Sequence, residues 1–330
     1  MIWLQFVLSA AVVVTAANYL AKYGDIIAVR TKLGGLFVGT IFLAAATSLP
    51  ELLASIHAFQ AGFPNLAAGN FFGSNMVNMV LLAITDLFYF QVPLLRRIAI
   101  NHALTTALAI MLMLIAITSM VADLDFKIGW VGVDSLLIIA AYFVGLRMIQ
   151  RGSRGSITVV APNVEPGPGF PTLWRGVLGF VISAIVLVLV VPSLVAASTG
   201  IAERTGVGTG FVGTALLSVV TSLPELIAVV AAMRINAFDM AVGNLFGSSI
   251  FNMFALGLSD FFYLDGRFLG AIDQNFVLVG LLGLLLTTMA LMGNMARVER
   301  RFMFIELDSA AIVVVYLLGM LLLFVKGIGV

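Results

Sequence analysis

The sequence contains no cysteine and only two histidines, His57 and His102, among its 330 residues. The absence of cysteine excludes disulfides, thiol chemistry and thiolate metal sites. Two isolated histidines do not predict a histidine-ligated metal centre, so we expect each to lie at a helix end or between helices. Because no nucleophile–base pair and no nucleotide-binding loop is evident, the sequence does not predict an enzyme.

Charged residues are also scarce, at 10% of the chain, whereas 62% is hydrophobic and the mean hydropathy is +1.15. The apolar segments recur along the whole length, which predicts an all-α polytopic membrane protein and excludes a signal peptide followed by a soluble domain. The apolar windows predict ten transmembrane helices, at residues 2–22, 34–60, 65–90, 98–121, 128–148, 173–199, 207–233, 238–263, 271–293 and 307–326.

The longest break, 149–172, is rich in glycine, proline and serine, which is typical of a flexible linker. It separates a first five-helix half, 1–148, from a second, 173–330. If the linker is cytoplasmic, 13 of the 17 lysines and arginines face the cytoplasm. This positive-inside bias predicts that both termini are external.

The chain also contains an internal repeat, because residues 37–90 align without a gap on residues 211–264. The two copies share 25 of 54 positions. Since each half has an odd number of helices, the second copy crosses the membrane in the opposite direction. Inverted repeats are typical of alternating-access transporters, although a duplication that builds a channel or a scaffold is the alternative.

Each copy carries one glutamate, Glu51 or Glu225, about midway along a predicted helix. An ionised carboxylate at bilayer depth is costly and therefore indicates a functional site. No lysine or arginine lies between residues 33 and 95, and the only one between 205 and 266 is Arg234, at the predicted cytoplasmic edge. The partner of these glutamates is therefore predicted to be a mobile cation or a proton.

Proline precedes each glutamate, at positions 50 and 224, so each helix should open there and expose carbonyl oxygens. Hydroxyl and amide side chains share the predicted faces, at Thr47, Ser48, Ser74, Asn78, Thr221, Ser222, Ser248 and Asn252. A kinked helix could use the hydroxyls to satisfy its own backbone, but that does not explain the glutamates. Because every donor atom is oxygen, the set suits a hard cation, Ca²⁺ or Na⁺ above all.

Small-residue faces accompany this polar set, at Gly69 and Gly73 and at their counterparts 243 and 247, and should let helices approach closely. Asn70 and Asn244 lie within these faces, and we expect them to bond between helices instead of binding the ion. Three further acids stand apart. We interpret Asp86 and Asp260, which are related by the repeat, as helix-end anchors, with an ion-pathway role as the alternative, and the sequence gives no role for Asp134.

The paired blocks Thr-Ser-Leu-Pro-Glu and Gly-Asn-x-x-Gly-Ser-x-x-x-Asn resemble the α-repeats of the cation/calcium exchanger superfamily, which includes the sodium/calcium exchangers. The resemblance covers the two repeats, about a third of the chain. It implies Ca²⁺ export driven by inward Na⁺ movement, with Glu51 and Glu225 as central ligands. The hydroxyl and amide side chains named above would complete the site.

One position departs from this pattern, because Asn252 stands where well-known sodium/calcium exchangers carry aspartate. The four central positions are then Glu51, Asn78, Glu225 and Asn252, with two carboxylates instead of three. Two carboxylates could balance one Ca²⁺, two Na⁺ or two protons. The sequence therefore leaves the driving ion and the stoichiometry open.

Together, these patterns predict a Ca²⁺/Na⁺ antiporter in the cytoplasmic (inner) membrane of a prokaryotic cell. We expect it to act as a monomer in the lipid bilayer, with cations as substrates and with no resident cofactor, nucleic acid or obligate protein partner. Exchange of Ca²⁺ or another cation for H⁺ through the same glutamates is the alternative. A cation channel or a membrane sensor that transports nothing is the third possibility.

Overall fold

The computed structural model describes residues 1–30, 43–88, 102–155, 171–234, 236–295, 301–302 and 305–328. Within these ranges, nine helices are long and apolar enough to cross a membrane, which confirms an all-helical polytopic membrane protein. The elements are α1 (Ile2–Arg30), α3 (Leu49–Gln60), α4 (Pro64–Phe88), α6 (Ala103–Ala122), β1 (Lys127–Ile128), β2 (Val131–Gly132), α7 (Val133–Gly155), α8 (Leu173–Thr205), α9 (Thr209–Val212), the π-helix η2 (Gly213–Leu217), α10 (Ser218–Thr221), α11 (Leu223–Arg234), α12 (Phe238–Ser259), α13 (Phe268–Ala271), α14 (Phe276–Met295), β3 (Arg301–Phe302), β4 (Ile305–Glu306) and α15 (Leu307–Lys326).

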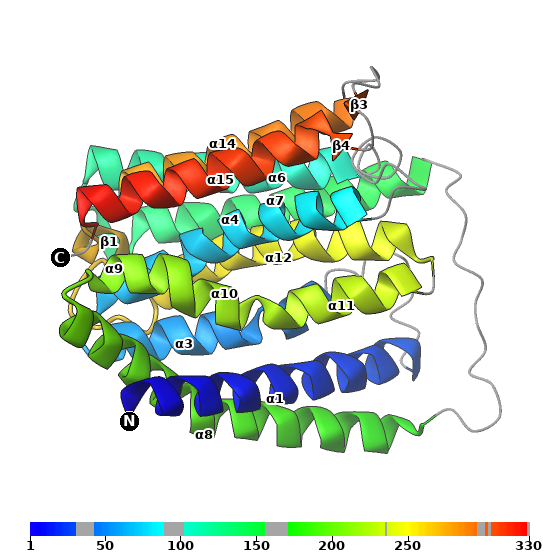
Figure 1. Ribbon diagram of the computed structural model, residues 1–330, viewed down its shortest axis with the longest axis horizontal. Coiled ribbons are helices and arrows are strands. Elements are labelled where there is room, and N and C mark those ends of the chain that lie inside the picture. Colours follow the sequence, from blue (N-terminus) through cyan, green and yellow to red (C-terminus); the bar gives the residue numbers. More distant parts are fainter. Residues whose placement is uncertain are drawn as a thin grey trace.

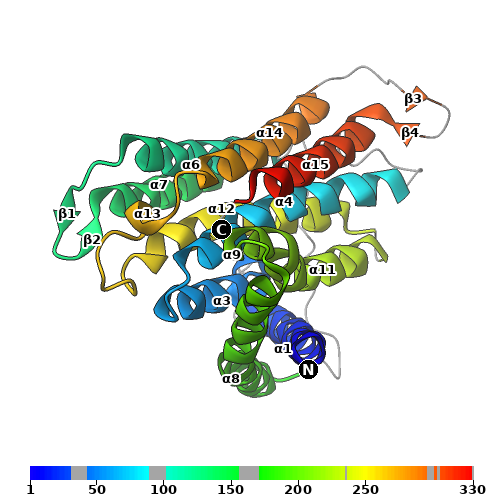
Figure 2. The same cartoon turned by 60° about the vertical axis from the view of Figure 1, so that its left-hand side comes forward.

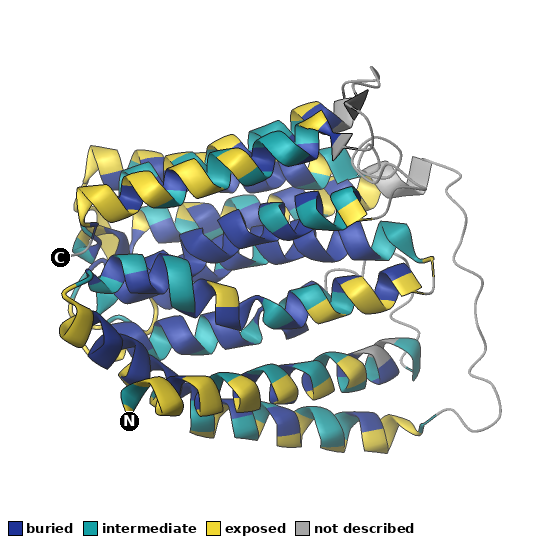
Figure 3. Cartoon of the chain, in the orientation of Figure 1, coloured by how far each residue is buried: buried dark blue, intermediate teal, exposed yellow. Residues whose placement is uncertain are grey.

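Helices α4 and α12 form the centre of the molecule (Figure 1). They are the most buried of the spanning helices in the described part of the chain, as the dark blue ribbons in Figure 3 show. Helices α6, α7, α14 and α15 cover one side of this pair, whereas α1 and α8 pack along each other on the far side of α3 and α11 (Figures 1 and 2). The outer helices expose leucine, valine and phenylalanine around the molecule, as lipid contact requires.

The two central helices run in opposite directions (Figure 1). The N-terminus and the C-terminus lie at the same end of the molecule, and α7 ends and α8 begins at the other end. This arrangement agrees with the inverted relationship that an odd number of crossings in each half predicts. Which end faces the cytoplasm remains a prediction from the distribution of basic residues.

Several predicted helix limits are wrong. Helix α1 continues to Arg30 and α8 to Thr205, beyond the predicted ends at 22 and 199, and α7 extends to Gly155, inside the predicted linker. The start of the predicted helix 34–60 lies outside the described residues. Its described part is broken at Ser48.

The predicted helix 128–148 begins only at Val133, because β1 and β2 form an antiparallel hairpin before it. Gly129 has a φ of +69° in this hairpin, which suits a tight two-residue turn. A second limit also differs, because the predicted helix 238–263 ends at Ser259. The apolar residues beyond that point form turns, which apolar composition alone does not reveal.

The small-residue face of α4 packs against α9 and the π-helix η2. A Cβ atom on Gly69 would lie 2.5 Å from the carbonyl oxygen of Gly210, and one on Gly73 would lie 2.7 Å from that of Thr214. No larger residue fits at either position without moving the backbone. The predicted close approach of helices at these two glycines is therefore present.

Candidate cation site

The two glutamates occupy equivalent places, each in the first turn of a short helix. The preceding helical segment ends at Thr47 or Thr221, and a new helix begins at Leu49 or Leu223. Proline is favourable at this point, because the first backbone N–H groups of a helix need no partner inside it. The same unpaired N–H groups make the helix start electropositive, which favours a carboxylate in the first turn.

Hydroxyl groups from one repeat bind the glutamate of the other. Ser48 Oγ donates to Glu225 Oε1 at 2.9 Å, and Ser222 Oγ donates to Glu51 Oε1 at 3.1 Å. Both carboxylates are buried, with Glu51 1% exposed and Glu225 fully enclosed. These crossed bonds hold the breaks in the two inverted repeats against each other at the centre of the molecule.

The site is not symmetric. Glu225 Oε1 accepts a second bond, from Ser248 Oγ at 3.2 Å, and Ser248 also lies 3.4 Å from the hydroxyl of Thr47. On the other side, Thr221 donates to the side-chain oxygen of Asn70 at 3.0 Å. The structure thus joins Thr47, Ser48, Ser248 and Glu225 in one network. It joins Ser222 and, through Asn70, Thr221 to Glu51 in a second.

Within the described part of the chain, the second oxygen, Oε2, of each glutamate has no hydrogen-bond partner, although it is buried. Other oxygen atoms share this property: Ser74 Oγ, Asn78 Oδ1 and Asn252 Oδ1. Among the described residues, neither Ser74 nor Asn78 forms a hydrogen bond to a glutamate, so their part in the site rests on their place along α4. Buried acceptors without a donor are costly, and a bound cation would satisfy them.

Neither glutamate forms an ion pair within the described part of the chain. The described residues also contain no group of three histidine, cysteine, aspartate or glutamate side chains that could hold a metal. A cation at Glu51 and Glu225 would therefore take its remaining ligands from hydroxyl, amide or carbonyl oxygens. That donor set fits Ca²⁺ or Na⁺ and does not fit zinc or copper.

The two asparagines of the glycine faces behave differently. Asn70 donates to the backbone oxygen of Glu51 at 3.0 Å and to Ser55 Oγ at 3.1 Å, as expected for a residue that bonds between helices. Neither side-chain atom of Asn244 has a hydrogen-bond partner among the residues that the structure describes, so the same expectation is wrong for it there. The repeat supplies one reason, because Val229 stands where Ser55 would be.

Sequence reasoning missed Ser55 and Asn75. Asn75 accepts a bond from Asn252 across the α4–α12 contact, at 3.2 Å. The available signal was that both positions break the identity between the repeats, with Val229 and Ser249 in the second copy.

The outlying aspartates act as anchors. Asp86 accepts a bond from Ser309 of α15 at 2.5 Å, and Asp260 accepts bonds from the backbone N–H groups of Gly132 and Phe268, at 2.6 and 2.5 Å. Burial raises the pKa of Asp260, which lies just beyond the end of α12. Both contacts fit the helix-end interpretation.

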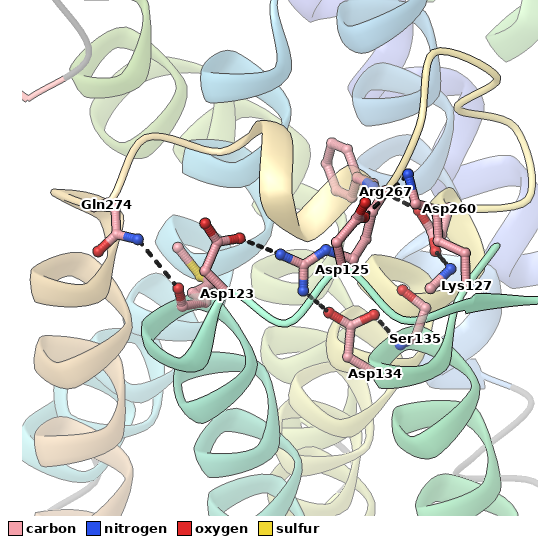
Figure 4. Close-up of polar contacts among 11 residues, drawn as sticks. Asp123, Asp125, Lys127, Asp134, Ser135, Asp260, Arg267 and Gln274 are labelled. Atoms are coloured by element: carbon pink, nitrogen blue, oxygen red, sulfur yellow. Dashed lines mark hydrogen bonds and ion pairs between the residues drawn. The ribbon is translucent and has the colours of Figure 1, made fainter. Parts of the chain in front are cut away.

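Asp134, which the sequence left without a role, forms an ion pair with Arg267 at 2.9 Å (Figure 4). Arg267 also pairs with Asp123, the residue that follows the end of α6. The two aspartates belong to the first half of the chain and the arginine to the second. This cluster therefore joins the two halves at one end of the molecule.

The fold and the site define a class. A helical membrane protein with antiparallel central helices, and with two buried carboxylates that lack an ion-pair partner at the helix breaks before α3 and α11, is a membrane transport protein for cations. The sequence profile of the family described as "Sodium/calcium exchanger protein" matches residues 1–149 and 175–326, and the chain belongs to this family.

The chain is also similar to individual proteins. The chain is 28% identical to "Inner membrane protein YrbG" of Escherichia coli (strain K12), over 74% of this chain and 75% of that protein. It is 27% identical to "Sodium/calcium exchanger MaX1" of Methanosarcina acetivorans, over 79% of this chain and 83% of that protein. Its fold is similar to the crystal structure of the "H+/Ca2+ Exchanger CAX", with a TM-score of 0.68, 14% identity and coverage of 99% of this chain and 89% of that chain.

Proposed function

We propose that this protein is an alternating-access antiporter that exports Ca²⁺ in exchange for Na⁺. The cation binds between Glu51 and Glu225, with oxygen ligands from Thr47, Ser48, Ser74, Asn78, Thr221, Ser222, Ser248 and Asn252. The observation that carries the proposal is the pair of buried glutamates, each held by a serine of the opposite repeat and each with one carboxylate oxygen unpartnered.

The crossed serine bonds suggest how binding is coupled to movement. Each glutamate belongs to one repeat and its serine to the other, so a cation that draws the carboxylates inward acts on both repeats at once. Alternating access through inverted repeats requires such a shared central contact, because one half must move relative to the other around the bound ion.

Charge balance limits the coupling. Two ionised glutamates compensate one Ca²⁺, whereas three Na⁺ would leave an excess positive charge. An uncompensated charge in a buried site of low dielectric constant is energetically costly. Asn252 contributes no charge. We therefore propose fewer than three Na⁺ per Ca²⁺, or a contribution from protons, and a cycle close to electroneutral.

Exchange of Ca²⁺ for H⁺ is the second candidate. Asn252 favours it, because two glutamates that release one Ca²⁺ can each take up a proton and leave the site neutral. Each of the two candidate reactions is the one named for a similar protein. The name of MaX1 specifies sodium, and that of CAX specifies H⁺. We further propose that the protein is a monomer in a cytoplasmic membrane, with both termini external.

The test is uptake of radiolabelled Ca²⁺ into proteoliposomes under an imposed Na⁺ or pH gradient. A Na⁺ gradient that drives uptake at constant pH supports the first candidate, and a pH gradient that drives it without Na⁺ supports the second. Glu51→Gln and Glu225→Gln should each abolish uptake and leave the protein folded, because glutamine keeps the shape and loses the charge. Glu203→Gln, at the exposed end of α8, is the matched control and should transport normally.

A further inference from the structure

Asn252 forms a hydrogen bond to a residue outside the proposed ligand set. Its Nδ2 donates to Oδ1 of Asn75 on α4 at 3.2 Å, and both side chains are fully buried. The remaining side-chain atom of Asn252, Oδ1, has no hydrogen-bond partner among the described residues. Asn75 therefore occupies the donor side of this amide and leaves the acceptor side free.

The orientation of an amide matters for a cation in a way that the orientation of a carboxylate does not. One side of the asparagine amide is an oxygen that accepts, and the other is an NH₂ group that only donates. A cation is attracted by the first and repelled by the second. A carboxylate presents oxygen on both sides, so it needs no such control.

The equivalent pair, Asn78 of the first repeat and Ser249 of the second, provides a comparison within the same molecule. Asn78, the counterpart of Asn252, has no hydrogen-bond partner in the described ranges for either side-chain atom. The position equivalent to Asn75 is Ser249, whose hydroxyl donates to the backbone of its own helix, at Leu245, at 3.0 Å. The bond between Asn75 and Asn252 is therefore not a general packing feature of the repeat.

We propose that Asn75 is a positioning residue, which fixes the Asn252 amide with its oxygen toward the transported cation. Asn75 itself has only its Nδ2 left unpartnered, and an NH₂ group is not a cation ligand, so the assignment is to positioning and not to binding. The inference rests on the proposed function, since it requires the cation to bind beside Asn252.

The experiment measures the Kd for Ca²⁺ of the purified full-length protein in detergent by calorimetric titration. Asn75→Leu keeps the approximate volume and removes the acceptor, so the Asn252 amide can turn. Loss of one such bond should raise the Kd about five- to tenfold. Ser249→Ala is the matched control at the equivalent buried position and should leave the Kd within about twofold.

The decisive comparison repeats Asn75→Leu in an Asn252→Asp background. Both oxygens of the aspartate accept, so no positioning is needed and Asn75→Leu should change the Kd by less than about twofold there. An equal loss in both backgrounds would assign Asn75 to packing and overturn the proposal. An unchanged Kd when Asn75→Leu is made in the otherwise unaltered protein would overturn the proposal as well.

Asn75→Ser provides the second variant if the leucine variant does not fold, because serine is the residue that the other repeat carries at this position. Because the serine side chain is shorter, we expect it to lose the bond to the Asn252 amide. Asn75→Ser should therefore raise the Kd in the otherwise unaltered protein and change it by less than about twofold in the Asn252→Asp background. Failure of the unaltered protein to bind Ca²⁺ would refute the proposed function itself. Normal Ca²⁺ binding with no effect at Asn75 would refute only the positioning role.

Discussion

Replacing Arg267 with methionine should lower the free energy of unfolding by about 3–5 kcal/mol, because it leaves a buried aspartate without its partner. The Arg267 side chain is 4% exposed, and Asp134, which it contacts at 2.9 Å, is 10% exposed. Asp123, its other partner, is 59% exposed, so that pair should contribute no more than about 1 kcal/mol. Methionine is the suitable replacement because its unbranched stem can follow the path of the arginine stem past Gly132.

The assay is equilibrium unfolding in mixed detergent micelles, followed by tryptophan fluorescence. Trp130 is a local probe, because it lies in the β1–β2 hairpin and its indole donates to the backbone oxygen of Phe261 at 3.2 Å. Asp123→Asn should cost less than about 1 kcal/mol. Arg204→Met, at the exposed end of α8, is the matched control and should change stability by less than about 0.5 kcal/mol.

A double-mutant cycle tests the cause. Arg267→Met should cost far less in an Asp134→Leu background, because no buried charge is then left unpaired. A cost below about 1 kcal/mol for Arg267→Met alone would refute the reasoning from burial. An equal cost in both backgrounds would mean that the arginine stabilises through its stem and not through its charge.

Three further results are expected. Ser55→Val should lower the free energy of unfolding by about 1 kcal/mol in the same assay, since Asn70 loses one buried bond, and an Asn70→Ala background should abolish the effect. Because burial raises the pKa of Asp260, the folded protein binds more protons than the unfolded chain, so stability should fall as the pH rises from 3.8 to the raised pKa. Asp260→Asn should flatten this pH dependence, and an unchanged slope would assign it to another group. A Ser156→Cys probe, which lies outside the described residues, should react with a thiol reagent only from the cytoplasmic side, and labelling from outside intact cells would reverse the topology.

The sequence predicted the class of the protein and the centre of its candidate site, for reasons that need no tertiary structure. Lipid contact demands long apolar segments, so the spanning helices are visible in composition. A carboxylate within such a segment is costly, so Glu51 and Glu225 stand out individually. The repeat made both signals stronger, because each feature occurs twice.

Helix ends were predicted less well, because composition does not distinguish an apolar turn from an apolar helix. The β1–β2 hairpin and the turn after Ser259 are both rich in large apolar residues. Their limits are decided by contacts such as those of Asp260, which binds one backbone N–H in β2 and another in α13. Such contacts connect segments that are distant in the sequence.

Only the tertiary structure decided which polar groups meet. Helical periodicity places Ser48 and Ser222 near the glutamate of their own repeat, but each serine bonds to the glutamate of the other repeat. The partners of Asn252 and Arg267 likewise lie in the opposite half of the chain. Periodicity specifies the face on which a side chain lies, whereas its partner depends on how the two inverted halves pack together.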